Sequence, residues 1–178
     1  MDTILVKALA VIGFVAATTV PATQLAASAA PADPSFVRAV AQCGSADLKA
    51  DYTSTDAGVG HRYGVLRLTN VSDQACSTGG DGGLSYVGHG DGTQLGAAAD
   101  RDPGTVRTIV LQPGARVQSR VDETVAQNYP KAACGRTHVD GFRVYVPNST
   151  VSQYVKHETT GCSKSGVHLI SHGPFSRG

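Results

Sequence analysis

The sequence contains no tryptophan, and aromatic residues make up only 6% of its 178 residues. Platforms on which bases or sugars stack are built from such rings, so a nucleic-acid cleft is disfavoured and a polysaccharide cleft is less favoured. The formal net charge is only +1, with acidic and basic residues interspersed. Nucleic acids and anionic membranes select strongly basic surfaces, and this charge balance therefore predicts neither partner.

The chain also lacks an apolar run long enough to cross a bilayer, which takes about 20 residues. Its longest run, ALAVIGFVAATTV, spans only Ala8 to Val20 and leads into the small residues QLAASAAPADP. This order is typical of a secretory signal peptide whose small-x-small cleavage site ends at Ala29. We therefore predict a signal peptide over residues 1–29, a leader segment over 30–42 and a single domain over 43–178, with no transmembrane segment in the mature chain.

No cysteine lies at the end of the apolar run, so lipid attachment is not expected, and we predict a secreted extracellular protein that is either free or associated with the cell wall. All four cysteines lie in the predicted mature chain: Cys43, Cys76, Cys134 and Cys162. No C-x-x-C pair is present, which disfavours a zinc site, and an even number in an oxidising compartment predicts two disulfides. Three pairings are possible. We favour the sequential one, whose loops would each stabilise the fold by roughly 3–4 kcal/mol.

Long stretches at helical spacing are absent, and apolar residues instead alternate in short runs broken by Gly, Pro, Asn or Asp. The clearest run is VRTIVLQPGARVQSRVDE, in which Ile109 and Leu111 share one face and Val117 and Val121 alternate with polar residues after a turn at QPG. This pattern predicts a β-hairpin. Further strands are expected within ADLKADYT, RYGVLRLTN, GFRVYVPN, SQYVKHE and GVHLISHGP. The fold class is thus all-β, an immunoglobulin-like antiparallel β-sandwich of about 7–9 strands with two disulfides.

No serine stands in a G-x-S-x-G turn, and no phosphate loop or dinucleotide fingerprint is present. We therefore assign no catalytic residue, no metal ligand and no cofactor. The alternative is a metal-dependent or hydrolytic extracellular enzyme that uses several of the side chains His61, His89, Asp91, His138 and His157. A secreted protease inhibitor is a further alternative, although no cysteine-stapled reactive loop is visible.

Two histidines stand in glycine-rich surroundings. His61 directly precedes a predicted strand in GVGHRY, and we expect its ring to hydrogen-bond a backbone group or a carboxylate such as Asp56. His89 and Asp91 lie in GHGDG, which could form half of a metal site. A solvated turn between two strands is the favoured interpretation, because the motif alone is weak.

The order of several short segments is more specific than any one of them. From Cys43 the chain runs through GVGHRY, LRLTNVSDQAC, LSYVGHGDGTQLG, LQPGARVQSRV, NYPKAACG, GFRVYVPNS and TTGCS. This series resembles the actinobacterial secreted family catalogued as domain of unknown function 4232, over Cys43 to about Pro174. The resemblance implies an exported or surface-anchored β-sandwich with no established activity. STGGDGG departs from the G-Y-P-G type of turn expected after Cys76.

These observations predict a non-catalytic interaction module that binds an unknown extracellular or cell-envelope component. Sandwiches bind through loops or an exposed sheet face, and the loop candidates are STDAGVGHRY, STGGDGG and AADRDPG. Their candidate binding residues, together with those of GHGDG, are His61, Arg62, Asp81, His89, Asp91, Asp100 and Arg101.

Overall fold

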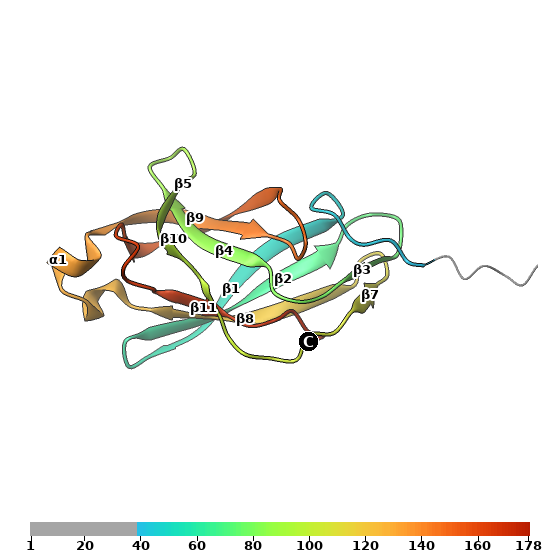
Figure 1. The fold of residues 1–178 in the computed structure, drawn as a ribbon, viewed down its shortest axis with the longest axis horizontal. Helices are drawn as coiled ribbons and strands as arrows, with labels where there is room; N and C mark the ends of the chain where they lie inside the picture. The colour runs from blue at the N-terminus through green and yellow to red at the C-terminus, as the bar shows by residue number, and fades with distance from the viewer. Residues whose placement is uncertain (1–38) are drawn as a thin grey trace, which may run out of the picture. The chain divides into compact units, whose positions relative to one another are not determined.

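The computed structural model describes residues 39–178, so the predicted signal peptide and most of the leader lie outside the described residues. The described chain forms eleven β-strands and two short helical turns (Figure 1). Their bounds are β1 Leu48–Gly58, β2 His61–Asn70, β3 Cys76–Thr78, β4 Gly83–Gly88, β5 Thr93–Ala98, β6 Asp100–Arg101, β7 Ile109–Leu111, β8 Arg116–Thr124, η1 Ala126–Asn128, α1 Lys131–Cys134, β9 Arg136–Tyr145, β10 Ser152–Cys162 and β11 Ile170–His172. The all-β class is confirmed, and the strand count exceeds the predicted 7–9 because several strands are only two or three residues long.

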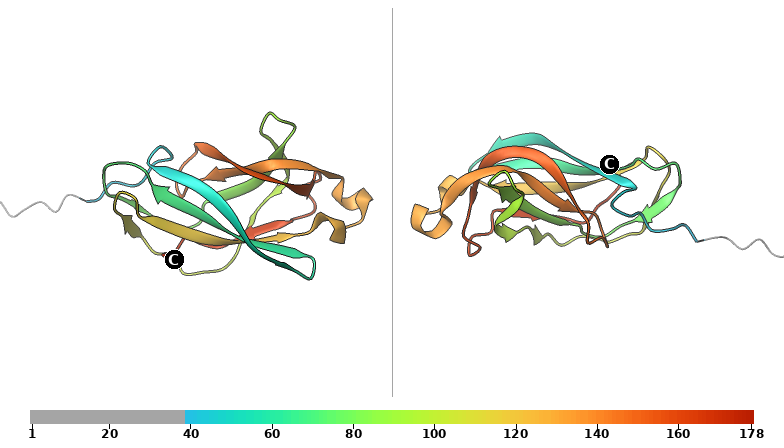
Figure 2. Two further views of the ribbon diagram at one scale, coloured as in Figure 1. Left: turned by 180° about the vertical axis from the view of Figure 1, so that it is seen from behind. Right: turned by 90° about the horizontal axis from the view of Figure 1, so that it is seen from above.

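Two larger sheets form the layers of a sandwich, as the views of Figure 2 show. The first has the order β1-β2-β8-β11-β6 and the second β10-β9-β4-β5. Buried side chains of both sheets pack into one core, among them Leu66 and Val117 from the first and Leu84, Phe142 and Val144 from the second. The pairs within both sheets are antiparallel except for β6 and β11, which are parallel.

The predicted hairpin across QPG is wrong in its pairing. The turn itself forms, with Ala115 N donating to Gln112 O at 2.9 Å, and the predicted core positions of both strands are buried. However, β7 pairs with β3 in a separate two-stranded sheet, whereas β8 pairs with β2 and β11. Alternation indicates which face of a strand is buried but not which strand lies beside it.

Both disulfides have the predicted sequential pairing. Cys43 joins Cys76 across 33 residues, and Cys134 joins Cys162 across 28 residues. The first ties the start of the domain to β3, and the second ties the end of α1 to the end of β10. No cysteine of the described residues is free.

A glutamine side chain links the two sheets along one open side of the sandwich. β1 and β10 are edge strands of the two sheets, and edge strands carry unpaired backbone groups. The Gln153 side chain on β10 accepts from Ala50 N at 2.9 Å and donates to Leu48 O at 2.6 Å and Ser45 O at 2.9 Å. The first sheet is thereby capped by the second on this side.

Candidate functional site

Two of the three predicted binding loops meet in the structure. STGGDGG connects β3 to β4, and AADRDPG contains β6; together they border an open hollow of about 780 Å³. Its lining includes Asp81 and Arg101 from these loops, with Val106, Tyr145 and Asn148 on the other walls. We call it the Asp81 hollow. Sequence reasoning had named Asp81 and Arg101 separately, and the fold brings them to one site.

The glycines of STGGDGG explain how this loop lies so close to its neighbours. A Cβ atom on Gly79 would lie 2.1 Å from Arg107 O, and one on Gly82 would lie 2.4 Å from Tyr145 O. Gly80 has a left-handed φ of 91°, and its carbonyl accepts from Phe175 N at 3.0 Å. Only glycine, which has no side chain, allows the loop to approach the neighbouring backbone this closely at these positions. This close approach places Asp81 on the wall of the hollow.

Asp81 carries an unsatisfied acceptor. Its Oδ1 atom is buried and has no hydrogen-bond donor among the described residues. The other buried side-chain atom of this kind is Thr78 Oγ1, and Thr78 lines an adjoining hollow that shares Gly79 and Asn148 with the first. Leaving such an atom unpaired costs roughly 1–3 kcal/mol, so this region is built at the expense of stability.

A buried histidine, His172 on β11, pairs with Arg101 of β6 near these loops. Burial lowers the pKa of His172, and the Arg101 charge lowers it further, against the opposing hydrogen bond to Gly173 and the charges of Asp81 and Asp102. The His172 Nδ1 atom lies 3.1 Å from Gly173 O and 3.3 Å from Ser119 Oγ. The hollow itself is lined by one carboxylate, Asp81, and one guanidinium, Arg101, which suits a ligand that has both a donor and an acceptor group.

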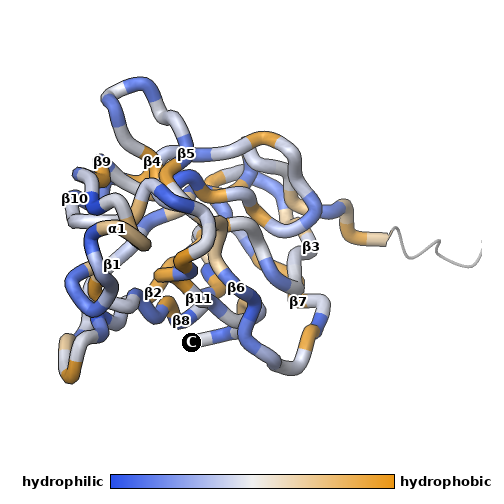
Figure 3. Tube along the Cα trace, turned by 60° about the vertical axis from the view of Figure 1, so that its left-hand side comes forward, coloured by the Kyte–Doolittle hydropathy of each residue, from blue (hydrophilic) through white to orange (hydrophobic). Residues whose placement is uncertain are grey.

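The third predicted loop lies apart, at the tip of the β1–β2 hairpin, where Figure 3 shows a hydrophobic segment. Val59 and Gly60 have φ angles of 47° and 81°, as in a type I′ turn. Val59 is fully exposed, at 102%. A β-branched residue is rare in this conformation, so the tip is a second, separate candidate surface.

His61 has the expected kind of partner but not the expected residue. Its Nδ1 atom lies 2.7 Å from Asp122 Oδ1 on the outer face of the first sheet, and its ring stacks on Tyr63 at 6.0 Å. Asp56 instead accepts from its neighbour Ala57 N. Arg62 is not a free loop residue either, because it donates to Thr159 Oγ1 on β10 at 2.8 Å.

GHGDG forms the predicted exposed turn, between β4 and β5. The backbone N–H of Thr93 bonds Asp91 Oδ1 at 2.9 Å and holds the pKa of this carboxyl below its usual range. His89 is exposed, with a φ of 64°. Asp140 accepts from Gly90 N at 2.8 Å and lies 3.4 Å from His138.

The remaining acidic candidate, Asp100, pairs with a distant residue. Its Oδ1 atom lies 2.8 Å from His168 Nδ1, and Asp102 accepts from Ser171 at 3.1 Å. Within residues 39–178, no three His, Cys, Asp or Glu side chains are placed to hold a metal ion. The histidines named for an enzyme stand on separate elements: His61 on β2, His89 in the β4–β5 turn, His138 on β9 and His157 on β10.

Sequence reasoning missed a polar cluster inside the sandwich. Glu123 on β8 is fully buried and accepts hydrogen bonds from Tyr52 Oη at 2.6 Å, Tyr86 Oη at 2.5 Å and His157 Nε2 at 2.9 Å. These four residues belong to β8, β1, β4 and β10, so the carboxylate joins the two sheets. The sequence does contain a signal for the buried position of Glu123, because the alternation of Val117, Ser119 and Val121 continues to Glu123 on the core face.

Aromatic packing holds this cluster. Phe142 stacks on His157 at 4.6 Å and on Tyr86 at 5.4 Å, while Tyr52 meets it edge-on at 5.0 Å. Gly64 leaves room for the Tyr52 ring, since a Cβ there would lie 2.1 Å from Tyr52 Oη. Burial, and also the Glu123 charge, raises the pKa of both tyrosines. The cluster is a structural link between the layers rather than an accessible site.

Comparison with known proteins adds one match. The family model described as Domain of unknown function (DUF4232) matches residues 43–176. No curated protein and no solved structure matches the chain. The immunoglobulin-like topology therefore stays a prediction. Within residues 39–178, no helix is long and apolar enough to cross a membrane.

Proposed function

The chain belongs to the DUF4232 family, and we propose that it is a non-catalytic extracellular binding module whose ligand enters the Asp81 hollow. The single observation that carries this proposal is that Asp81, whose Oδ1 atom is buried without a partner among the described residues, lines an open hollow. Buried acceptors are almost always paired, and a ligand whose N–H or O–H group displaces the glycine-rich loop enough to reach Oδ1 would pair this one.

The walls indicate the kind of ligand. Asp81 would accept from an amide or ammonium group, Arg101 would bind a carbonyl or carboxylate, and Val106 and Tyr145 supply apolar surface between polar ends. A peptide segment of an extracellular or cell-envelope component has these groups. Secretion is part of the proposal; it rests on the signal-peptide pattern of residues 1–29 and is supported by the two disulfides, which persist in oxidising compartments.

A photo-crosslinking amino acid at position 106 tests the proposal in culture. Val106 is 60% exposed at the rim of the hollow, and the matched control is Val59, an equally apolar exposed residue at the other candidate loop. We expect a saturable adduct with an envelope or secreted component from position 106, identified by mass spectrometry, and competition by unlabelled protein. Adducts only from position 59 would move the binding site to the hairpin tip, and adducts from neither position would contradict the proposal.

A further inference from the structure

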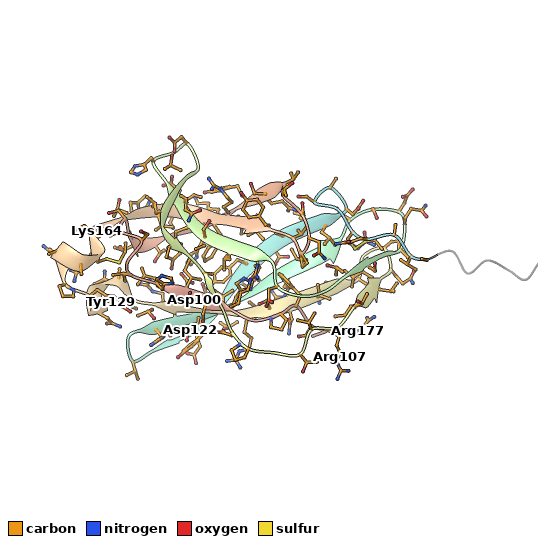
Figure 4. All side chains as sticks on the ribbon, viewed as in Figure 1. Asp100, Arg107, Asp122, Tyr129, Lys164 and Arg177 are labelled. Carbon is orange, nitrogen blue, oxygen red and sulfur yellow. A yellow bond between two sulfur atoms is a disulfide. The ribbon has the colours of Figure 1, made fainter. Side chains whose placement is uncertain are left out.

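Half of the chain's ten arginines are found at one side of the first sheet. We call this surface the arginine face and define it as Arg67, Arg107, Arg116, Arg120 and Arg177. Figure 4 shows Arg107 and Arg177 on the same side of the molecule. Clustering of this kind is invisible in a net charge of +1, because acidic residues elsewhere offset it.

These arginines line three adjoining hollows of about 360, 450 and 580 Å³. Arg67, Arg116 and Arg177 line the first, Arg120 the second, and Arg107 with Arg177 the third. Gln118 and Ser176 lie between hollows and are shared by them. The positive charge therefore follows an extended surface rather than one small pocket.

The C-terminal segment is held firmly enough to contribute to this surface. Ser176 and Gln118 exchange two backbone hydrogen bonds, of 2.8 and 2.9 Å, which fix the segment along β8. Arg177 follows directly and donates to Val110 O at 2.9 Å. Arg177 thus lines the same hollow as Arg67 and Arg116.

Most of this charge is not neutralised within the protein. Arg67 donates to Thr53 and lies 3.7 Å from Asp51, but the other four arginines take part in no ion pair among residues 39–178. The acidic side chains Asp102 and Asp122 line only the hollow of about 450 Å³, beside Arg120, and no acidic side chain of the described residues lines the other two hollows.

From this geometry we propose that the arginine face binds a linear polymer that carries phosphate groups. The planar guanidinium donates paired hydrogen bonds that match a phosphate, and arginines spread over adjoining hollows match repeated anionic groups better than a single ion. Base-bearing polymers are disfavoured, because bases bind by stacking on exposed aromatic rings. Only two aromatic residues of the described chain line the hollows, and of these Phe175 is buried, which leaves Tyr63 alone for stacking. This site is distinct from the Asp81 hollow and does not depend on it.

The test is a calorimetric titration of the protein, with its predicted signal peptide removed and its disulfides intact, against long-chain polyphosphate at several salt concentrations. We expect wild-type affinity to fall steeply with salt, and the Arg116→Gln/Arg120→Gln variant to bind at least about tenfold more weakly with a salt slope lower by about 1–2. The matched control, Lys131→Gln/Lys156→Gln, loses the same two charges from exposed positions outside the arginine face and should change affinity less than about threefold.

Three results would overturn the proposal: no binding by the wild type, equal weakening by both double variants, or equally tight binding of single-stranded DNA with the same charge. The second would reduce the effect to overall charge, and the third would make the ligand a nucleic acid. Circular dichroism of each variant checks that the sandwich remains folded, which all four substitutions should permit because the replaced side chains are exposed.

Discussion

Replacement of Glu123 by alanine should lower the free energy of unfolding by about 3–5 kcal/mol, because it leaves three hydrogen-bond donors without their acceptor inside the sandwich. These donors are the hydroxyls of Tyr52 and Tyr86 and the His157 ring nitrogen, and the variant would also open a cavity between the sheets. Urea denaturation followed by circular dichroism measures the loss. A loss below about 1 kcal/mol would contradict the account of this cluster as the link between the layers.

The matched substitution is Tyr86→Phe, which removes only one donor and should cost about 1–2 kcal/mol.

The stability of the wild type measured over a pH series gives an independent check. Burial alone would raise the pKa of Glu123, but the hydrogen bond and charge of His157 and the bonds from Tyr52 and Tyr86 hold it below the usual 4.5. Its folded pKa thus lies below its unfolded pKa, so its contribution is full above about pH 4.5 and is lost as pH falls through the folded value. Glu123→Gln should flatten this acid limb.

Loss of either disulfide should have the next largest effect. In the chain-entropy model, closing loops of 28 and 33 residues stabilises the fold by about 3.5 kcal/mol each, so Cys134→Ala/Cys162→Ala and Cys43→Ala/Cys76→Ala should be destabilised similarly. Chemical denaturation of both double variants measures the two losses.

The losses of unfolding free energy in the two double variants can be compared, and the comparison shows how each disulfide stabilises the protein. Equal losses would indicate that each bridge acts mainly on the unfolded chain. A loss below about 1 kcal/mol at either bridge would contradict this, and would show that the fold around it is held by packing instead. Mild reduction of the wild type, followed by mass-spectrometric identification of the free thiols, shows which bridge is reduced first.

The sequence was most informative where a pattern depends on local chemistry. Alternation predicts the strands, and the glycines of GHGDG predict a turn, because both signals are local in the chain. The pairing of β7 with β3 could not be read in the same way, because it is set by packing between segments far apart in the chain. The parallel pairing of β6 with β11 is not predictable from the sequence for the same reason.

The candidate site was predicted in part. Asp81 lies in the glycine-rich loop STGGDGG and Arg101 in the loop AADRDPG, but no pattern indicates that these loops border one hollow or that Asp81 Oδ1 lacks a donor. The interior position of Glu123 could be predicted from alternation, whereas its three partners come from other strands. Spacing in the sequence carries no information about contacts that only the two-layer fold creates.

The most direct test of the central claim, that Asp81 serves a ligand and not the fold, is the free energy of unfolding of Asp81→Ala compared with wild type. Because its buried oxygen has no partner in the described structure, Asp81→Ala should leave stability unchanged or raise it by up to about 3 kcal/mol, while crosslinking from position 106 is lost. A decrease of more than about 1 kcal/mol would show that Asp81 is a structural residue and would contradict the claim.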